Sequence, residues 1–303
     1  MRKMMTLINR EFWEQRSVFF NVPIILASIF AVVALVLLFL SMGHGVDSGT
    51  MQAELTRADI VEFIPSAFAA IASPFVIILW LIVFYYFLGS LYDDRKDGSV
   101  LFWQSMPISQ TQTLASKLIA GLVLAPFCTW VVVMVTQVFA LCIVSIFLVI
   151  HPVMAWTTLW DPSAILLSWL RIFAAMLVQG LWLLPLFAWC LLCSAFSKRA
   201  PALRALIPVI LLVILEFLLL RWNVVYHFII SRFKYASIMW YQLSSDSARI
   251  ISRHGDINVV HKINQKLHLT GFNWQSFAVG LLVSAVFIVI AAVFRRNCYD
   301  FDR

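Results

Sequence analysis

Long apolar runs constrain this chain more than any other feature of its sequence. A helix needs about 18 to 25 apolar residues to cross the ~30 Å hydrocarbon core of a bilayer. Because a backbone in lipid must satisfy its hydrogen bonds within its own segment, such runs are expected to be helices. The sequence therefore predicts an all-α integral membrane protein, one domain over residues 1–303, with transmembrane helices at 22–41, 67–89, 118–150, 164–193, 205–222 and 274–294.

The composition excludes an ordinary soluble domain. Hydrophobic residues make up 62% of the chain and charged residues 12%, whereas soluble domains average about half and about a quarter. The net charge of +7 comes from basic residues spread along the predicted membrane borders. That distribution favours contact with membrane lipid and argues against nucleic acid as a partner.

Lysine and arginine predict the orientation. Placing the N-terminus in the cytoplasm puts thirteen basic residues in cytoplasmic segments, one (Arg57) in the first outer loop and none in the second. The last outer loop, 223–273, weakens the contrast because it carries six. Cytoplasmic segments still hold more, so both termini are predicted to be cytoplasmic.

The first 21 residues are predicted to form an amphipathic helix at the membrane surface. One face would hold Met1, Met4, Met5, Ile8, Phe12 and Phe19, and the other Lys3, Arg10 and Glu14. The alternative is that they merely flank the first span, with incidental amphipathicity.

Two spans exceed the membrane thickness. Residues 118–150 would measure about 50 Å as one helix, so a tilt, a protrusion or a bend near Pro126 is expected, and Pro185 is the equivalent position in 164–193. Within the external loop 223–273, apolar spacing predicts a short external helix at 257–269, with Asp256 as its N-cap.

Motifs for catalysis are absent from the sequence. No lysine precedes Ser or Thr, so there is no nucleotide-binding loop, and neither a nucleophile elbow nor a His-Glu-x-x-His helix occurs. We therefore expect no catalytic residue, no metal site and no cofactor bound by this chain. His254, His261 and His268 are interpreted as solvated positions, and Cys190 and Cys193 as packing residues rather than a redox pair.

Arg171 and Glu216 are the charged residues predicted inside spans. Such groups are costly in lipid and usually functional. They would form a structural ion pair or line a substrate pathway, and Glu216 also lies near Arg221. The pathway reading supports an alternative function, an ion- or proton-coupled carrier. A third hypothesis, a lipid-modifying enzyme, would use His254 or Asp256.

The segment 91–117 is polar and charge-balanced between two spans. Gly98 interrupts it, and an apolar cluster that includes Phe102 and Trp103 follows. Ser109 and Gln112 form a capping box that starts the next helix. Anchored on a long span, such a segment suits docking into a groove of a soluble partner, or its aromatic residues belong to the interfacial belt.

The string "DRKDGSVLFWQSMPIS" followed by "TLASK" resembles the first cytoplasmic loop of a bacterial subgroup of ABC-2-type permeases, the membrane subunits of ATP-binding-cassette exporters, and "REFWEQRS" resembles their opening helix. Matching loop positions are Asp94, Arg95, Lys96, Asp97, Ser99, Phe102, Trp103, Ser105, Pro107, Ser109, Thr113, Ser116 and Lys117. The chain departs from that pattern at Gln104, Met106, Gln110 and Gln112.

The resemblance implies a transport subunit in the bacterial cytoplasmic membrane rather than an enzyme. Two permease copies, identical or different, would each receive a cytoplasmic ATPase subunit that binds ATP and Mg. The coupling helix in 91–117 would dock on that ATPase through Asp94, Arg95, Lys96, Asp97, Phe102, Trp103 and Pro107. The N-terminal helix would support this contact and the external helix would help close the exit. The resemblance does not identify the exported substrate, but the Phe, Leu, Val and Trp residues of the spans suit a lipid-like or amphipathic one.

Overall fold

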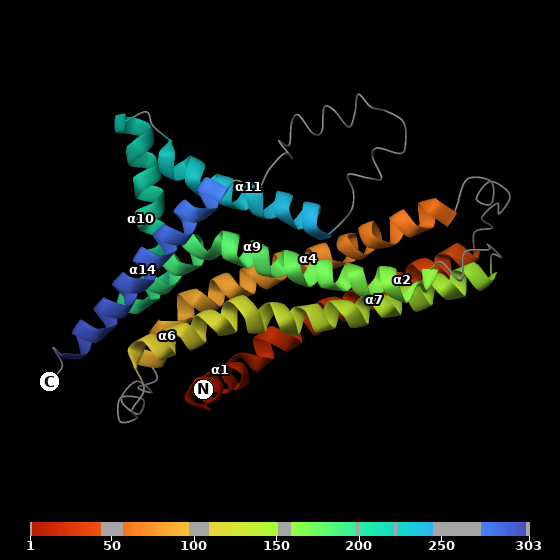
Figure 1. Ribbon diagram of the computed structural model, residues 1–303, viewed down its shortest axis with the longest axis horizontal. Helices are drawn as coiled ribbons and strands as arrows, with labels where there is room; N and C mark the ends of the chain where they lie inside the picture. The colour runs from red at the N-terminus through yellow and green to blue at the C-terminus, as the bar shows by residue number, and fades with distance from the viewer. Residues whose placement is uncertain are drawn as a thin grey trace.

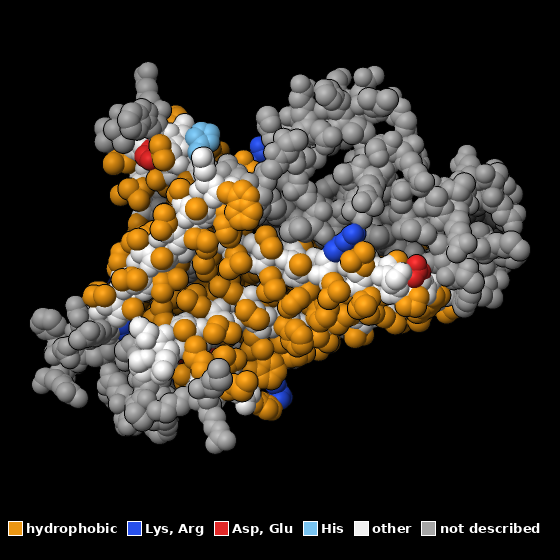
Figure 2. All heavy atoms as spheres, viewed as in Figure 1, with side chains coloured by type: hydrophobic (Ala, Val, Ile, Leu, Met, Phe, Trp, Pro, Cys, Tyr) orange, Lys and Arg blue, Asp and Glu red, His pale blue; other side chains and the backbone are white. Residues whose placement is uncertain are grey.

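The computed structural model describes residues 2–43, 57–96, 109–150, 159–197, 200–220, 223–244 and 274–300, and these residues are almost entirely helical. Six of their helical runs are long and apolar enough to cross a membrane, in the order that the sequence predicts. Hydrophobic side chains cover most of the described surface in Figure 2. The predicted all-α class and the number of apolar helices are confirmed, and they indicate a multi-pass membrane protein.

The chain begins with one continuous helical run. Helix α1, Arg2–Arg16, passes through a π-helical turn at Ser17–Asn21 into α2, Val22–Gly43. Met5, on the predicted apolar face of α1, is exposed, whereas Glu11 is buried. The side of α1 that packs against the bundle therefore includes an acidic residue, which amphipathic spacing did not predict.

Helix α4, Arg57–Lys96, is much longer than its predicted span of 67–89. Its 40 residues would measure about 60 Å at 1.5 Å per residue. The helix continues beyond the apolar run because no glycine or proline follows Gly89 until Gly98. The charged start of segment 91–117 is thus helical and rigidly joined to the span.

The third run starts at the predicted capping box. Ser109 Oγ accepts a hydrogen bond from the Gln112 N–H, and Gln112 Oε1 accepts one from the Ser109 N–H, both at 3.2 Å. Helix α6, Gln110–Ile119, continues through a π-helical turn at Ala120–Leu124 into α7, Ala125–Ile150. The turn ends two residues before Pro126, whose missing N–H disfavours a regular α-helical register. The tilt, protrusion or bend predicted for this span stays a prediction.

The remaining helices are α9, α10, α11 and α14, at Pro162–Phe196, Pro201–Leu215, Val224–Ser244 and Trp274–Asp300. A π-helical turn at Glu216–Leu220 extends α10. Helix α11 lies inside the predicted external loop and was not predicted, because its apolar residues are interrupted by Arg232 and Lys234. The helix predicted at 257–269 lies outside the described residues.

Helix α9 occupies the centre of the bundle and packs against α4, α11 and α14 (Figure 1). Aromatic side chains fill its contact with α4: the ring of Trp80 stacks on Phe187, and Phe87 lies against the same ring. Gly180 permits this approach, since a Cβ there would lie 2.6 Å from Trp80 Cη2. The packing of α4 against α9 positions the polar ends of both helices.

Helix α1, helix α6 and the C-terminal part of α14 lie at one end of the bundle (Figure 1). Chain direction brings the end of α4 to the same place, since α6 follows it after twelve residues, 97–108, that are outside the described set. This end carries the candidate site.

The close contact at Gly180 is testable by substitution. Val at this position would place its Cβ inside the Trp80 ring, so we expect G180V to lose about 1–3 kcal/mol of stability through overpacking. Thermal unfolding in detergent measures this loss. The control is L181V, at an exposed neighbouring position; equal stability of the two variants would contradict the packing described here.

Candidate functional site

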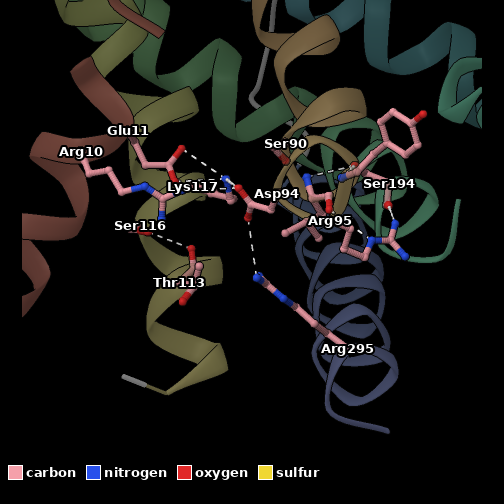
Figure 3. Close-up of polar contacts among 12 residues, drawn as sticks. Arg10, Glu11, Ser90, Asp94, Arg95, Thr113, Ser116, Lys117, Ser194 and Arg295 are labelled. Carbon is pink, nitrogen blue, oxygen red and sulfur yellow. Dashed lines mark hydrogen bonds and ion pairs between the residues drawn. The ribbon is translucent and has the colours of Figure 1, made fainter. Parts of the chain in front are cut away.

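A cluster of charged side chains and one tyrosine is buried where α1, α4, α6 and α14 meet (Figure 3). We call it the charged joint, and its members are Arg10, Glu11, Tyr86, Asp94, Lys117 and Arg295. Its members come from four helices that are far apart in the sequence or, for α4 and α6, separated by residues 97–109. The cluster therefore determines how the helix ends are arranged in space.

The centre of the charged joint is the pair between Lys117 and Glu11. Lys117 Nζ lies 3.1 Å from Glu11 Oε1, and both side chains are only 2% exposed. The hydroxyl of Tyr86 donates to Glu11 Oε2 at 2.8 Å. A buried charge requires a charged partner and further hydrogen bonds, and Glu11 has both, so this contact links α1, α4 and α6 closely.

Asp94 is shared by three cations from three helices. Its Oδ1 lies 3.3 Å from Lys117 Nζ and 3.5 Å from Arg10 Nη2, and its Oδ2 lies 3.6 Å from Arg295 Nη2. Arg10 also pairs with Glu14 at 2.6 Å. The three cations thus face two buried carboxylates, Glu11 and Asp94, while Glu14 pairs with Arg10 at the exposed edge of the joint.

Arg95 makes a second connection at the end of α4. Its Nη2 donates to the backbone carbonyls of Ser194 and Ser197, at the C-terminal end of α9, where carbonyls have no intrahelical partner. In return, Ser194 Oγ accepts hydrogen bonds from the N–H groups of Leu91 and Tyr92 at 3.1 and 3.0 Å. The last turn of α4 is therefore held to the end of α9.

Both helices that flank residues 97–108 are thus held to the bundle. Asp94 and Arg95 hold the last turn of α4, and Lys117 holds α6 seven residues after its start at Gln110. Of the predicted coupling residues, Asp94 is buried, Arg95 is half-buried and Lys96 is exposed. Asp97, Phe102, Trp103 and Pro107 lie outside the described residues, and their contact with an ATPase stays a prediction.

Sequence reasoning found that the charges of segment 91–117, Asp94 and Lys117 among them, balance as a group. It paired no two of these residues and missed Glu11, Tyr86 and Arg295 as partners. The usable signal was Lys117 itself, since a lysine between Leu114 and Leu118 on a helix leading into the membrane needs a buried acid. Which acid approaches it depends on the packing of α1, and sequence spacing does not contain that information.

Arg171 and Glu216 lie apart from the charged joint. Glu216 Oε2 accepts a hydrogen bond from the backbone N–H of Val225 at 2.9 Å, so it caps the start of α11. Arg171 is half-buried in the first third of α9. The contact seen for Glu216 is a structural one, since it satisfies one of the unpaired N–H groups at a helix start.

The part of the chain that the structure describes contains no group of three or more His, Cys, Asp or Glu side chains arranged to hold a metal ion. Cys190 and Cys193 are both buried in α9, as packing residues would be. His254, His261 and His268 are outside the described residues.

The pairing within the charged joint is testable with a double substitution. K117M leaves the Glu11 carboxylate buried without its cation, so we expect a loss of about 3–5 kcal/mol, seen as a lower unfolding temperature or lower yield. E11Q/K117M removes both charges and keeps an acceptor for Tyr86, so stability should partly return.

K96M is the matched control because Lys96 is exposed one turn beyond Leu91 on the same helix. It should unfold like the original chain. If the double variant is no more stable than K117M alone, the described pair is wrong.

Comparisons with known proteins identified no relative: no family model, no curated protein and no solved structure matches this chain.

Proposed function

We propose that this chain is the membrane permease subunit of an ABC transporter, exporting a lipid-like or amphipathic substrate with ATP hydrolysed by a separate ATPase subunit. The proposal combines three supports: six apolar helices, the resemblance of residues 94–117 to ABC-2-type permease loops, and the absence of a nucleotide-binding motif in the sequence. The charged joint is the structural observation that favours it most.

The charged joint favours this function because it provides a rigid base on both sides of residues 97–108. A partner bound to that segment pushes on α4 and α6 together, since Asp94 at the end of α4 lies 3.3 Å from Lys117 of α6. Both helices then continue along the bundle, α4 for 40 residues and α6 into α7. Displacement at one end is therefore transmitted along whole helices.

The burial of Asp94 and Arg95 refines their proposed roles. They act as anchors that hold the coupling segment to the bundle, while the exposed Lys96 and the aromatic side chains of Phe102 and Trp103 contact the ATPase. Asp97 and Pro107 delimit that contact. Aromatic anchors commonly dominate the energy of such interfaces.

In this proposal two permease copies pair in a bacterial cytoplasmic membrane with both termini inside, and ATP and Mg are bound by the ATPase alone. Closure of the ATPase pair favours one of two arrangements of the helices. Helix α1 would contribute through Arg10 and Glu11, which join it directly to Asp94 and Lys117.

The aromatic anchors are testable by isolating the complex. The tagged chain, purified gently from its native host, is expected to bring an ATP-hydrolysing subunit with it. F102A/W103A should reduce recovery of that subunit at least tenfold, because two hot-spot side chains contribute roughly 2 kcal/mol or more each.

The control is F39A, which removes an aromatic side chain that is 78% exposed on α2, far from this segment. Normal recovery with F102A/W103A, together with unchanged ATP hydrolysis by the complex, would contradict the assigned anchors. Absence of any nucleotide-binding subunit would contradict the function itself.

Glu216 separates this proposal from the carrier alternative. Because its carboxylate caps α11, E216Q keeps an amide oxygen as acceptor for the Val225 N–H, and ATP hydrolysis by the complex should stay within about twofold of normal. A carrier would instead transport protons in proteoliposomes that contain no ATPase, and E216Q would abolish this proton flux. Observing both results would refute the proposal.

A further inference from the structure

Helix α11 carries a fully buried arginine that does not belong to the charged joint. The side chain of Arg232 is 1% exposed and lies between α11, α9 and α14. Its guanidinium carbon is 5.0 Å from the ring centre of Trp182 and 4.7 Å from that of Phe228. Both rings therefore make cation–π interactions with the guanidinium.

Arg232 contacts two helices that are long and apolar enough to cross a membrane, α9 and α14. Trp182 lies fourteen residues before the end of α9 at Phe196, which is about 21 Å along the helix. Gly280 lies six residues after the start of α14 at Trp274, about 9 Å. Together these lengths approach the ~30 Å of a hydrocarbon core. A charged residue at this depth is a functional hypothesis by default.

The charge of Arg232 is only partly compensated. Its Nη2 donates to the Ser276 carbonyl at 2.6 Å, but its Nε is buried without a hydrogen-bond partner. Within the described residues no carboxylate pairs with it, in contrast to each cation of the charged joint. A buried donor without an acceptor costs roughly 1–3 kcal/mol, so an added acceptor at this edge would be favourable.

The donors of the guanidinium define the chemistry of a ligand. Nε–H has no acceptor and Nη2 reaches only the Ser276 carbonyl of α14, so a ligand that enters as α14 moves away would meet Nε–H and Nη2 on one side of the guanidinium. That side matches two oxygens of a carboxylate or a phosphate group. The rings around it would contact an attached hydrocarbon chain.

We propose that Arg232 is the recognition element of a binding site for an anionic amphiphile, whose carboxylate or phosphate head pairs with the guanidinium between α11 and α14. The inference rests on this chain alone and does not depend on its pairing with an ATPase.

Access to the site requires α11 to separate from α14. A Cβ at Gly280 would lie 2.7 Å from both Nη1 and Nη2 of Arg232, so backbone of α14 covers the guanidinium closely. Figure 1 shows the start of α14 beside α11. Binding of an anionic head is therefore coupled to the opening of this helix pair.

The test measures the unfolding temperature of the purified chain in neutral detergent with three probes: dodecyl phosphate, phosphatidylglycerol and inorganic phosphate. The original chain should be stabilised by several degrees by the two amphiphiles and not by inorganic phosphate. R232M should lose this shift, and R232K should keep part of it, because lysine retains the charge without the planar fork.

K234M is the matched control: it removes one positive charge from an exposed position two residues away on α11, and should keep the full shift. R232M without ligand should unfold at an unchanged or higher temperature, because it removes an incompletely paired buried charge. If R232M fails to fold, G280A continues the test, since its Cβ displaces the guanidinium while the charge remains, and the shift should fall.

The proposal is wrong if R232M and the original chain show equal shifts, or if R232M is destabilised without ligand while its shift persists, as a purely structural arginine predicts. An equal shift from inorganic phosphate alone would also overturn it, because the ligand would then be a small anion and not an amphiphile. A shift from phosphatidylglycerol but not dodecyl phosphate would support it and identify bilayer lipid as the source of the head group. The reverse would support it with a free amphiphile.

Discussion

The buried ion cluster at one end of the bundle determines how the ends of four helices meet. Asp94 has cations from α1, α6 and α14 within 3.6 Å, and Glu11 holds Lys117 from the opposite side. In a protein whose other contacts are mainly apolar, such pairs add specificity, because only one arrangement brings all the charges together. Removing Lys117 would leave the buried Glu11 carboxylate without its cation.

Helix continuity extends the effect of this cluster through the molecule. The runs α1–α2 and α6–α7 each pass through a π-helical turn without ending, and α4 crosses the whole bundle unbroken. A π-helical turn changes which face of a helix points inward while preserving its length. The N-terminal part of each run can therefore meet the polar joint while the following part presents apolar residues to the bundle or to lipid.

The buried charges of this protein differ in how completely they are paired. In the charged joint each of the three cations lies within 3.6 Å of a carboxylate, as a structural element requires. Arg232 instead has aromatic faces and one carbonyl, and its Nε lacks a partner. The first arrangement stabilises a fixed geometry, and the second leaves hydrogen-bonding capacity for a ligand. This difference is the reason for proposing the anion site at Arg232 and a mechanical role for the joint.

Local sequence determined the features that depend on local physics. Apolar run length predicted six helices able to cross a membrane, and Ser109 with Gln112 predicted the capping box. The limits of α4 were underestimated because a helix continues through charged residues when no breaker intervenes. Helix α11 was missed because Arg232 and Lys234 interrupt its apolar pattern. Only the tertiary structure decided that Glu11 and Arg295 complete the joint and that Arg232 lies against Trp182 and Gly280, since these contacts join residues tens to hundreds of positions apart and depend on how whole helices pack.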